Sequence, residues 1–344
     1  MKQSQHNLSQ VNFALLRKYI NESTLLFVGL VLGVLSFCYF RVRVVGKLDT
    51  AQFQQIMDLL PKDWRKFSSV DFDWLVSYLG RTSFTLDEPM LVLLISAWAI
   101  VRGSDVVSGE LGRGTMEMFL AQPISRTRVF LHHAAYTIIG LVVLVLVAWL
   151  GMSIGLWTTN VEETRYPEIL GVPITFVGPK TAVVAELFGI PAESLQPKMT
   201  EVPMSSEVDA VMFLPGLVNL FSLGFFLSAF SAMVSSMDSF RWRTLGILPA
   251  FYFANAGIKI LGMSMEESPW VVYCSIFGLY SPASSVELAQ HNLLDALQWI
   301  RYDDAGAIVS SGPLLNNVVL IGLGVICYLV GTRVFQKRDL PAPT

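Results

Sequence analysis

The sequence predicts an all-α polytopic membrane protein with six transmembrane helices, because it is unusually apolar and carries long segments without charge. Hydrophobic residues make up 53% of its 344 residues and charged residues 15%, whereas about 25% of the residues in an ordinary globular domain are charged. The mean hydropathy is +0.53. A soluble chain of this size has too little interior for so much apolar surface, so lipid is the solvent that the composition indicates. Residues 1–344 are therefore treated as a single transmembrane domain.

A transmembrane helix needs about 20 predominantly apolar residues, and six segments approach that length. The predicted spans cover approximately residues 23–40, 83–102, 131–157, 210–237, 244–263 and 308–332. Two of them rest on short uncharged runs, Pro89–Val101 and Thr244–Ile258. The second span must therefore extend back past Asp87 and Glu88 or forward through Arg102 to cross the bilayer.

The distribution of basic residues predicts that both termini lie in the cytoplasm. In that orientation, half of the 24 Lys and Arg residues fall in the four short inner segments, and the other half are spread over outer loops of about twice the total length. Basic residues near span ends are retained on the cytoplasmic side. The outer loops are residues 41–82, 158–209 and 264–305, and the loop 103–128 is cytoplasmic. Arg41 and Arg43 oppose this orientation, although long loops carry little weight in the rule.

The sequence predicts a different structure for each of two short apolar segments outside the spans. Residues 8–20 place Leu8, Val11, Leu15 and Tyr19 on one helical stripe. We therefore expect an amphipathic elbow helix within residues 1–22 that lies in the membrane interface; the alternative is a plain juxtamembrane tail. The segment Val271–Pro282 is apolar but too short to span, and such a length is typical of a re-entrant or interfacial segment.

The sequence contains no recognisable catalytic or cofactor-binding motif, so no catalytic residue, metal or cofactor is predicted. It lacks the Walker A, HExxH and GxSxG patterns. His132 and His133 are adjacent, so on a helix they point about 100° apart and do not form an i, i+4 metal-ligand pair. A formal net charge of −3 gives no reason to expect nucleic acid as a partner.

Several polar residues interrupt the predicted spans and are candidates for a substrate path. They are Asn219, Asn255, Lys259 and Asn316. Polar groups within a bilayer are often functional, and Asn255 and Lys259 share a helix face at i, i+4. The alternative is structural: Lys259 extends to the outer interface, while Asn255 forms a hydrogen bond with a neighbouring helix.

The most distinctive stretch is the loop GSDVVSGELGRGTMEMFLAQPISRTR, residues 103–128. Its glycines divide it into short pieces, and Thr115 precedes a short predicted helix that Pro123 ends. This helix carries apolar and charged side chains of both signs. A protein groove is a better partner for such a helix than an anionic lipid surface, which prefers basic residues.

This loop resembles the cytoplasmic signature of type-2 ABC transporter permeases, the membrane subunits of ATP-driven exporters. In that signature a glutamate (Glu110) is followed by Gly-Thr (Gly114 and Thr115), a short apolar helix (Met116–Ala121), a proline (Pro123) and Ser-Arg (Ser125 and Arg126). The predicted elbow helix, the six spans and the re-entrant segment are similar to the family, as is the tail that begins FQKRDL at Phe335. The lengths of the first and second outer loops depart from it.

The resemblance implies that residues 110–126 form a coupling helix that docks on a separate ATP-hydrolysing subunit, while the chain itself is not an enzyme. The residues expected at that interface are Glu110, Arg113, Gly114, Thr115, Met116, Glu117, Phe119, Leu120, Pro123, Ser125 and Arg126. Apolar side chains would supply the main contacts and the charged ones the register. A second copy or a paralogue would complete the path in the inner membrane of a prokaryote. The alternatives are a scaffold that docks a cytoplasmic partner without transport, and a membrane enzyme that uses His132 or His133.

Overall fold

The computed structural model describes residues 2–48, 53–54, 59, 61, 70–116, 118, 125–165, 168–169, 172–173, 198–265, 268–290, 292–302 and 308–339. The α-helices within them are α1 (Lys2–Lys47), α3 (Phe72–Leu75), α4 (Tyr78–Ser83), α5 (Pro89–Ser104), α6 (Glu110–Gly112), α8 (Arg126–Thr158), α10 (Leu214–Met237), α11 (Arg241–Ser264), α12 (Pro282–Ala289) and α13 (Pro313–Lys337). A π-helical segment, η3 (Asp105–Gly109), joins α5 to α6. Short 3₁₀ helices include η2 (Phe84–Leu86), η7 (Pro269–Cys274) and η8 (Ile276–Gly278).

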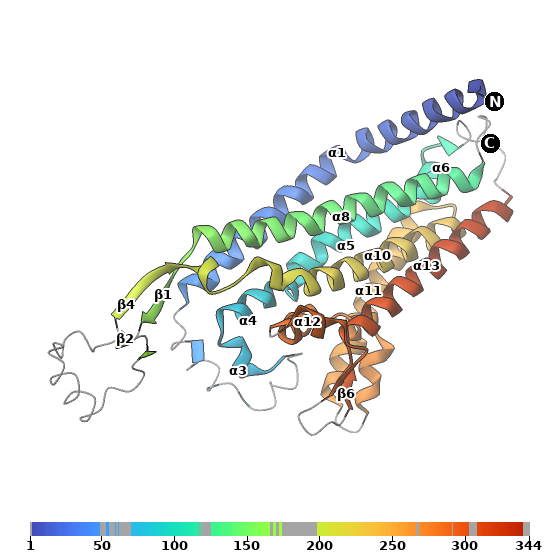
Figure 1. Ribbon diagram of the computed structural model, residues 1–344. Helices are drawn as coiled ribbons and strands as arrows, with labels where there is room; N and C mark the ends of the chain where they lie inside the picture. Colours follow the sequence, from blue (N-terminus) through green and yellow to red (C-terminus); the bar gives the residue numbers. More distant parts are fainter. Residues whose placement is uncertain are drawn as a thin grey trace, which may run out of the picture.

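Three two-stranded antiparallel sheets lie in the connections between these helices. They pair β1 (Asn160–Arg165) with β4 (Lys198–Pro203), β2 (Glu168–Ile169) with β3 (Val172–Pro173), and β5 (Ile300–Tyr302) with β6 (Ile308–Ser311). The first sheet joins Asn160 to Pro203 and Arg165 to Lys198. It extends away from the helices, as Figure 1 shows.

Within the described residues, six helical segments are long and apolar enough to cross a membrane, as predicted. They are Leu15–Lys47, Tyr78–Gly112, Arg126–Thr158, Ala210–Met237, Arg241–Ser264 and Pro313–Lys337. The chain is thus an all-α polytopic membrane protein. The second segment extends in both of the directions considered above, because α4 and η2 precede α5 and the helix continues through Arg102 to Gly112.

The sixth span begins later than residue 308, so its predicted start was wrong. Residues Ile308–Ser311 form β6, whose backbone pairs with β5 through Ser311 and Ile300. Pro313 then occupies the first position of α13, where its fixed φ and missing N–H suit a helix start. The hydrophobic pattern could not separate an apolar strand from the first turn of an apolar helix.

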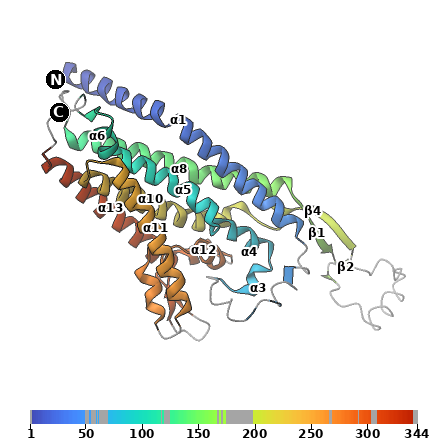
Figure 2. The same ribbon diagram turned by 180° about the vertical axis from the view of Figure 1, so that it is seen from behind.

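The six long segments form an elongated bundle with two different ends. The N-terminal end of α1, α6 and the C-terminal end of α13 lie together at one end, which we term the motif end (Figures 1 and 2). The opposite end, which we term the re-entrant end, carries α12 and the β5–β6 pair. Along the bundle, α1 packs on α8, and α10 packs on α5 and α13. Both termini and the 103–128 motif thus share one end, as an even number of spans requires.

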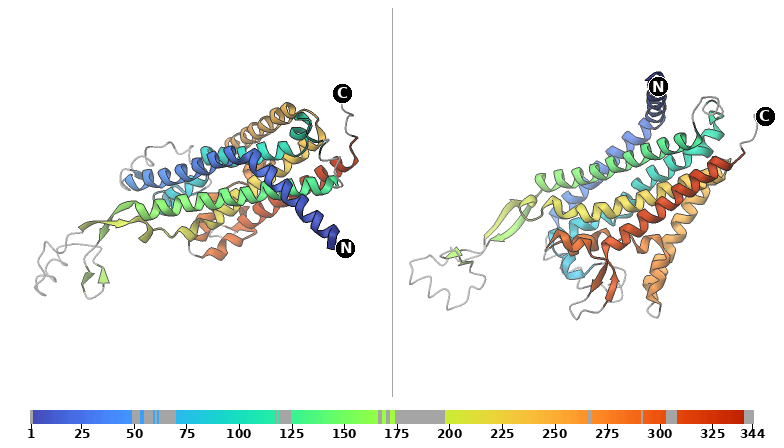
Figure 3. Two further views of the ribbon diagram at one scale, coloured as in Figure 1. Left: turned by 90° about the horizontal axis from the view of Figure 1, so that it is seen from above. Right: turned by 45° about the vertical axis from the view of Figure 1, so that its right-hand side comes forward.

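The expected elbow helix is not a separate element. Helix α1 runs without interruption from Lys2 to Lys47, so the segment 8–20 is continuous with the first span, and Figure 3 shows the helix changing direction along its N-terminal half. Of the residues on the predicted apolar stripe, Leu15 and Tyr19 are buried. They pack near Tyr136 of α8, so protein covers this part of the stripe.

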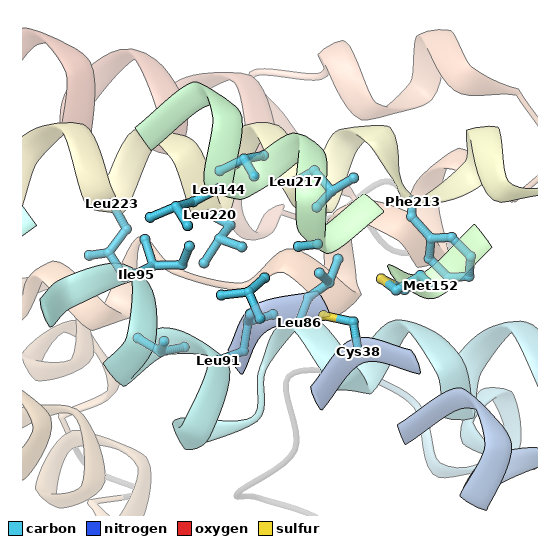
Figure 4. Packing of buried hydrophobic residues seen from close by; sticks show 14 of the residues in the cluster. Cys38, Leu86, Leu91, Ile95, Leu144, Met152, Phe213, Leu217, Leu220 and Leu223 are labelled. Atoms are coloured by element: carbon cyan, nitrogen blue, oxygen red, sulfur yellow. The ribbon is translucent and has the colours of Figure 1, made fainter. Parts of the chain in front are cut away.

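The main core lies where α5, α8 and α10 meet. Leu91 and Ile95 of α5 approach Leu144 of α8 and Leu220 and Leu223 of α10 in Figure 4, and all five side chains are at most 1% exposed. Glycines let the backbones approach closely, as is common in membrane helices. Because the seams are closely packed, changes of side-chain volume along them are expected to be destabilising.

Replacing Gly140 by valine is expected to destabilise the bundle by about 1–3 kcal/mol or more, because extra atoms in a packed core force neighbouring atoms to move. A Cβ atom at this position of α8 would lie 2.2 Å from Cζ2 of Trp98. Trp98 is fully buried, and its indole N–H donates to the carbonyl of Thr137. The apparent melting temperature in detergent should fall clearly. Gly29→Val is the matched control, because no atom lies within 4 Å of a Cβ there; equal losses in the two variants would refute the packing argument.

Candidate functional site

The candidate site is built where the second span ends at the motif end. Helix α5 does not stop at Ser104 but widens into the π-helical segment Asp105–Gly109 and then tightens into α6. Insertions of this kind are frequent at functional sites. After α6 the chain turns at Gly114, whose φ of +69° is a conformation that glycine adopts without steric cost. The backbone conformation of this turn therefore explains why the motif has a glycine here.

A group of seven charged residues, here termed the ionic cluster, surrounds this turn. It contains Lys18, Glu22, Arg102, Asp105, Glu110, Arg113 and Arg241. Its members come from α1, α5, the π-helical segment, α6 and its C-terminal turn, and α11. Four positive and three negative groups nearly balance, which is how charged side chains are accommodated at membrane depth.

Glu110 is 2% exposed and Asp105 5% exposed, so Glu110 is the more deeply buried of the two described acids of the motif. Its carboxylate accepts a hydrogen bond from Nζ of Lys18 at 2.7 Å, another from Nη2 of Arg113 at 3.0 Å, and a third from the hydroxyl of Thr115. The backbone N–H of Thr115 donates to the Glu110 carbonyl at 3.1 Å. A buried carboxylate is tolerated when its lone pairs are filled in this way. Glu110 therefore holds α1 and the turn after α6 together.

Asp105 makes the second junction of the ionic cluster. One carboxylate oxygen lies 3.1 Å from Arg113 and 3.0 Å from Arg241 at the start of α11, and the other lies 3.1 Å from Arg102 of α5. Arg113 thus bridges both acids. The two carboxylates raise the pKa of the Arg113 guanidinium, which outweighs the lowering by partial burial, so this residue stays charged at any physiological pH.

Arg102 connects the ionic cluster to α8. Its Nη2 lies 3.2 Å from Nε2 of His133, and because a guanidinium only donates, the histidine nitrogen is the acceptor. The guanidinium carbon also lies 5.3 Å from the ring centre of Tyr136 and 6.0 Å from that of Tyr19, within the range of cation–π contacts. Arg102 is 2% exposed, and its terminal nitrogens contact Asp105 and His133 within the protein.

Hydroxyl groups extend the connection from the π-helical segment to α10 and α11. The backbone N–H groups of Val107 and Ser108 donate to Oγ of Ser235 at 3.2 and 2.9 Å, and Ser235 donates to the carbonyl of Ser104. Oγ of Ser108 lies 3.3 Å from that of Thr244 in α11. The widened turn is therefore hydrogen-bonded to two further spans.

The two histidines considered for an enzyme have separate surroundings. His132 makes its contact through Nδ1 to the carbonyl of Arg128 at 2.8 Å, one turn earlier in the same helix, whereas His133 contacts Arg102. Over the part of the chain that the structure describes, no group of three or more His, Cys, Asp or Glu side chains is arranged to hold a metal ion.

The position of Met116 differs from the expectation that it contacts a partner. Its side chain is 1% exposed and packs in an apolar group with Val106, Phe130 and Phe335. Met118, the next methionine of the motif, is 70% exposed. Met116 therefore belongs to the bundle interior here.

The end of the predicted docking loop is also attached to the bundle. Ser125 caps α8 by accepting from the N–H of Arg128. Nη1 of Arg126 donates to the carbonyls of Phe335 at 3.3 Å and Arg338 at 2.6 Å. Both ends of the loop are thus fixed, one at Glu110 and one at Arg126. The remaining expected contact residues, Glu117, Phe119, Leu120 and Pro123, lie outside the described residues.

The four candidate path residues gather at the re-entrant end around the chain from Ser275 to Ser281. Asn219 donates to the carbonyl of Leu279 at 3.2 Å and accepts from the N–H of Ser281 at 2.9 Å. Asn255 accepts from the N–H of Ile276 at 3.1 Å, and Lys259 donates to the carbonyl of Tyr280 at 3.1 Å.

These hydrogen bonds satisfy the irregular backbone of the expected re-entrant segment, of which residues 275–280 are buried or half-buried while Tyr273 and Cys274 are exposed. Non-helical backbone at membrane depth requires such burial. Asn316 is 3% exposed and lies nearby, beside the cavity described below. Asn219, Asn255 and Lys259 therefore stabilise the backbone of this segment, whether or not they also line a substrate path.

Sequence reasoning selected Glu110, Arg113 and Thr115 but missed Lys18, Asp105 and Arg241. Asp105 lies inside the quoted motif, but it falls outside the predicted span, so the rule for charges within the bilayer did not single it out. The other two come from distant parts of the chain, and only the packing of α1 and α11 brings them to the motif.

Residues 83–202, about a third of the chain, match the family described as the C-terminal domain of the multidrug efflux system permease Rv1217c. The matched region begins in α4 and continues through the motif and α8 to β4. No curated protein matches the chain. The family match fits an ABC-type permease, which confirms the permease resemblance, and it indicates a multi-pass membrane permease of an efflux system. The narrower type-2 assignment stays a prediction.

Proposed function

We propose that this chain is the membrane subunit of an ATP-driven exporter in the inner membrane and that a separate ATPase drives it through the loop 110–126. The observation that carries the proposal is the ionic cluster. It attaches the start of that loop to α1, α5 and α11 through Glu110 and Asp105. A displacement of the loop by a partner would therefore be passed to three spans at once.

The surroundings of the loop support docking at this end. Met118 is 70% exposed and the side chain of Arg113 is 34% exposed, so an apolar and a charged contact face outward while Met116 faces inward. The chain has no Walker A sequence of its own, and a separate nucleotide-binding subunit would supply one. Efflux by the matched family favours export, and we propose two copies or a copy and a paralogue as the complete path.

A double variant of the loop tests the docking. Phe119→Glu with Leu120→Glu is expected to abolish stimulation of the partner ATPase and to lower transport at least about tenfold, because losing apolar contacts at the centre of an interface commonly costs 2 kcal/mol or more. The measurement is ATPase activity and export in vesicles that contain the chain and its co-expressed ATPase, together with co-purification of the two subunits.

The matched control is Leu59→Glu, which introduces the same change at an 83% exposed leucine of the loop that follows α1. This variant should keep ATPase stimulation and export. If the loop variant also keeps both, the docking role is wrong. If the subunits co-purify and the loop controls their association, but no export accompanies ATP hydrolysis for any cargo tested, the scaffold alternative replaces the exporter.

A further inference from the structure

A cavity of about 240 Å³ lies at the re-entrant end between α11, η7, α12 and β6. Figure 1 shows α12 and β6 at this end of the bundle. Its polar wall includes Lys259, Ser281, Ser284, Arg301 and Asn316, and its apolar wall includes Met263 and Leu288. The cavity is smaller than the roughly 300–1,000 Å³ of sites for drug-sized ligands. It therefore suits a headgroup rather than a whole drug-like molecule.

The polar wall of this cavity is rich in hydrogen-bond donors. The ammonium group of Lys259 has three N–H groups, and one of them donates to the carbonyl of Tyr280 at 3.1 Å. Arg301 donates to Oγ of Ser284 at 2.8 Å and to Glu287 at 2.9 Å, so two of its five N–H groups have partners among the described residues. Ser284 accepts from Arg301, and a hydroxyl that accepts can also donate its own proton. Donors of this kind match the oxygens of a phosphate.

Among the residues that the structure describes, one acceptor of the wall has no hydrogen-bond partner. Oδ1 of Asn316 is buried without a hydrogen bond, and the residue is 3% exposed. Leaving a buried acceptor unpaired is unfavourable, and a ligand that brings a hydroxyl or amine donor would remove this cost. The residues of the wall therefore match a ligand that combines an anionic group with a hydrogen-bond donor.

Exposed aromatic residues place the cavity at the depth of lipid headgroups. Trp270 and Tyr273 on η7, Trp299 beside β5 and Tyr302 on β5 are 65%, 46%, 54% and 56% exposed. Trp and Tyr gather where a membrane meets water. Tyr273 itself lines the cavity. The apolar side chains of Met263 and Leu288 offer a surface on which the acyl chain of a lipid can pack below its headgroup.

We propose that this cavity binds the phosphate headgroup of a membrane phospholipid whose headgroup also carries a hydroxyl or amine. Lys259 and Arg301 hold the phosphate, and Asn316 accepts from the hydroxyl or amine. This site is independent of the motif end, so it stands whether or not an ATPase docks there.

The test is native mass spectrometry of the delipidated full chain, titrated with dioleoyl phosphatidylglycerol, dioleoyl phosphatidylcholine or inorganic phosphate. Phosphatidylglycerol has both a phosphate and hydroxyl donors, whereas phosphatidylcholine has no donor in its headgroup. We expect saturable binding of phosphatidylglycerol that is on the order of tenfold tighter than that of phosphatidylcholine, since a lost hydrogen bond to a buried group is worth about that ratio.

Variants separate the cavity from general lipid association. Lys259→Gln and Arg301→Gln should each weaken phosphatidylglycerol binding about tenfold, and Asn316→Leu should remove the preference over phosphatidylcholine. Arg301 is 23% exposed at its side chain, so its variant is expected to fold even if that of Lys259 does not. The matched control is Arg43→Gln, a cation at the same end that donates to the carbonyl of Thr158 and lies outside the cavity wall.

Equal binding of both lipids to the unaltered chain would overturn the proposal, as would equal losses in Arg301→Gln and Arg43→Gln. Inorganic phosphate that displaces phosphatidylglycerol at comparable concentrations would assign the site to free phosphate and overturn the lipid as its occupant.

Discussion

Replacing Glu110 by glutamine is expected to lower export at least about tenfold and to destabilise the motif end by about 2 kcal/mol. The variant keeps the size of the side chain but removes the charge that Lys18 and Arg113 contact at 2.7 and 3.0 Å. Truncating one partner of a buried charge pair costs about 2–5 kcal/mol. The side chains of Lys18 and Arg113 are 26% and 34% exposed, so water compensates in part and the lower value applies. Thermal unfolding in detergent and export in vesicles measure the two effects.

Glu22→Gln is the control for this loss of charge. Glu22 belongs to the same ionic cluster, but its side chain is 31% exposed and its contacts with Lys18 and Arg113 are longer, 3.5 and 3.9 Å. Pairs of this kind contribute about 0–1 kcal/mol, so this variant should stay close to the unaltered chain. Lys18→Gln should reproduce much of the Glu110 effect, whereas Arg17→Gln, at an exposed neighbouring position, should not. Additive losses in the Lys18 and Glu110 double variant would show that the pair is not coupled.

Asn219→Leu is expected to loosen the re-entrant end and to cost about 2–4 kcal/mol, because buried partners left without a hydrogen bond cost about 1–3 kcal/mol each. Asn219 is fully buried. It donates to Leu279 and to Oδ1 of Asn317 at 2.8 Å and accepts from Ser281. Leucine has a similar volume but none of these bonds. The measurement is thermal unfolding in detergent, combined with the rate of thiol labelling at Cys274, an exposed free cysteine on η7.

Ser222→Ala is the matched control for Asn219. Ser222 lies one turn further along α10, is also fully buried, and donates only to the carbonyl of Val218 within its own helix. Its removal should leave the labelling rate unchanged. If Asn219→Leu labels and melts like the control, the polar residue does not hold the re-entrant segment.

The sequence predicted the six spans well because lipid demands long apolar helices, and that demand is visible in composition alone. Its difficulty with the second span has a physical cause. Charged residues interrupt that helix, yet each has a partner elsewhere in the fold: Arg102 contacts His133 of α8, Glu88 pairs with Arg41 of α1 at 2.7 Å, and Asp87 accepts from the N–H of Ala283 at 3.1 Å. A hydropathy pattern counts these charges as breaks because it does not contain the partners.

The candidate site was predicted only in part, for a similar reason. The motif itself marked Glu110, whose neighbours Arg113 and Thr115 are close in sequence. Lys18 is 92 positions away, and no local pattern joins two such residues. The π-helical segment and the left-handed turn at Gly114 both precede Met116. Spacing rules for a regular helix do not apply across such a segment.

The uninterrupted course of α1 has a consequence for how force crosses the membrane. Its 46 residues give a contour length of about 69 Å at 1.5 Å per residue, whereas a bilayer with its headgroups measures about 40–45 Å. A substantial part of this helix must therefore run along the membrane surface or stand in water. No hinge of broken hydrogen bonds separates that part from the span. A torque applied to α1 near Lys18 would therefore also rotate the part of the helix that lies in the membrane.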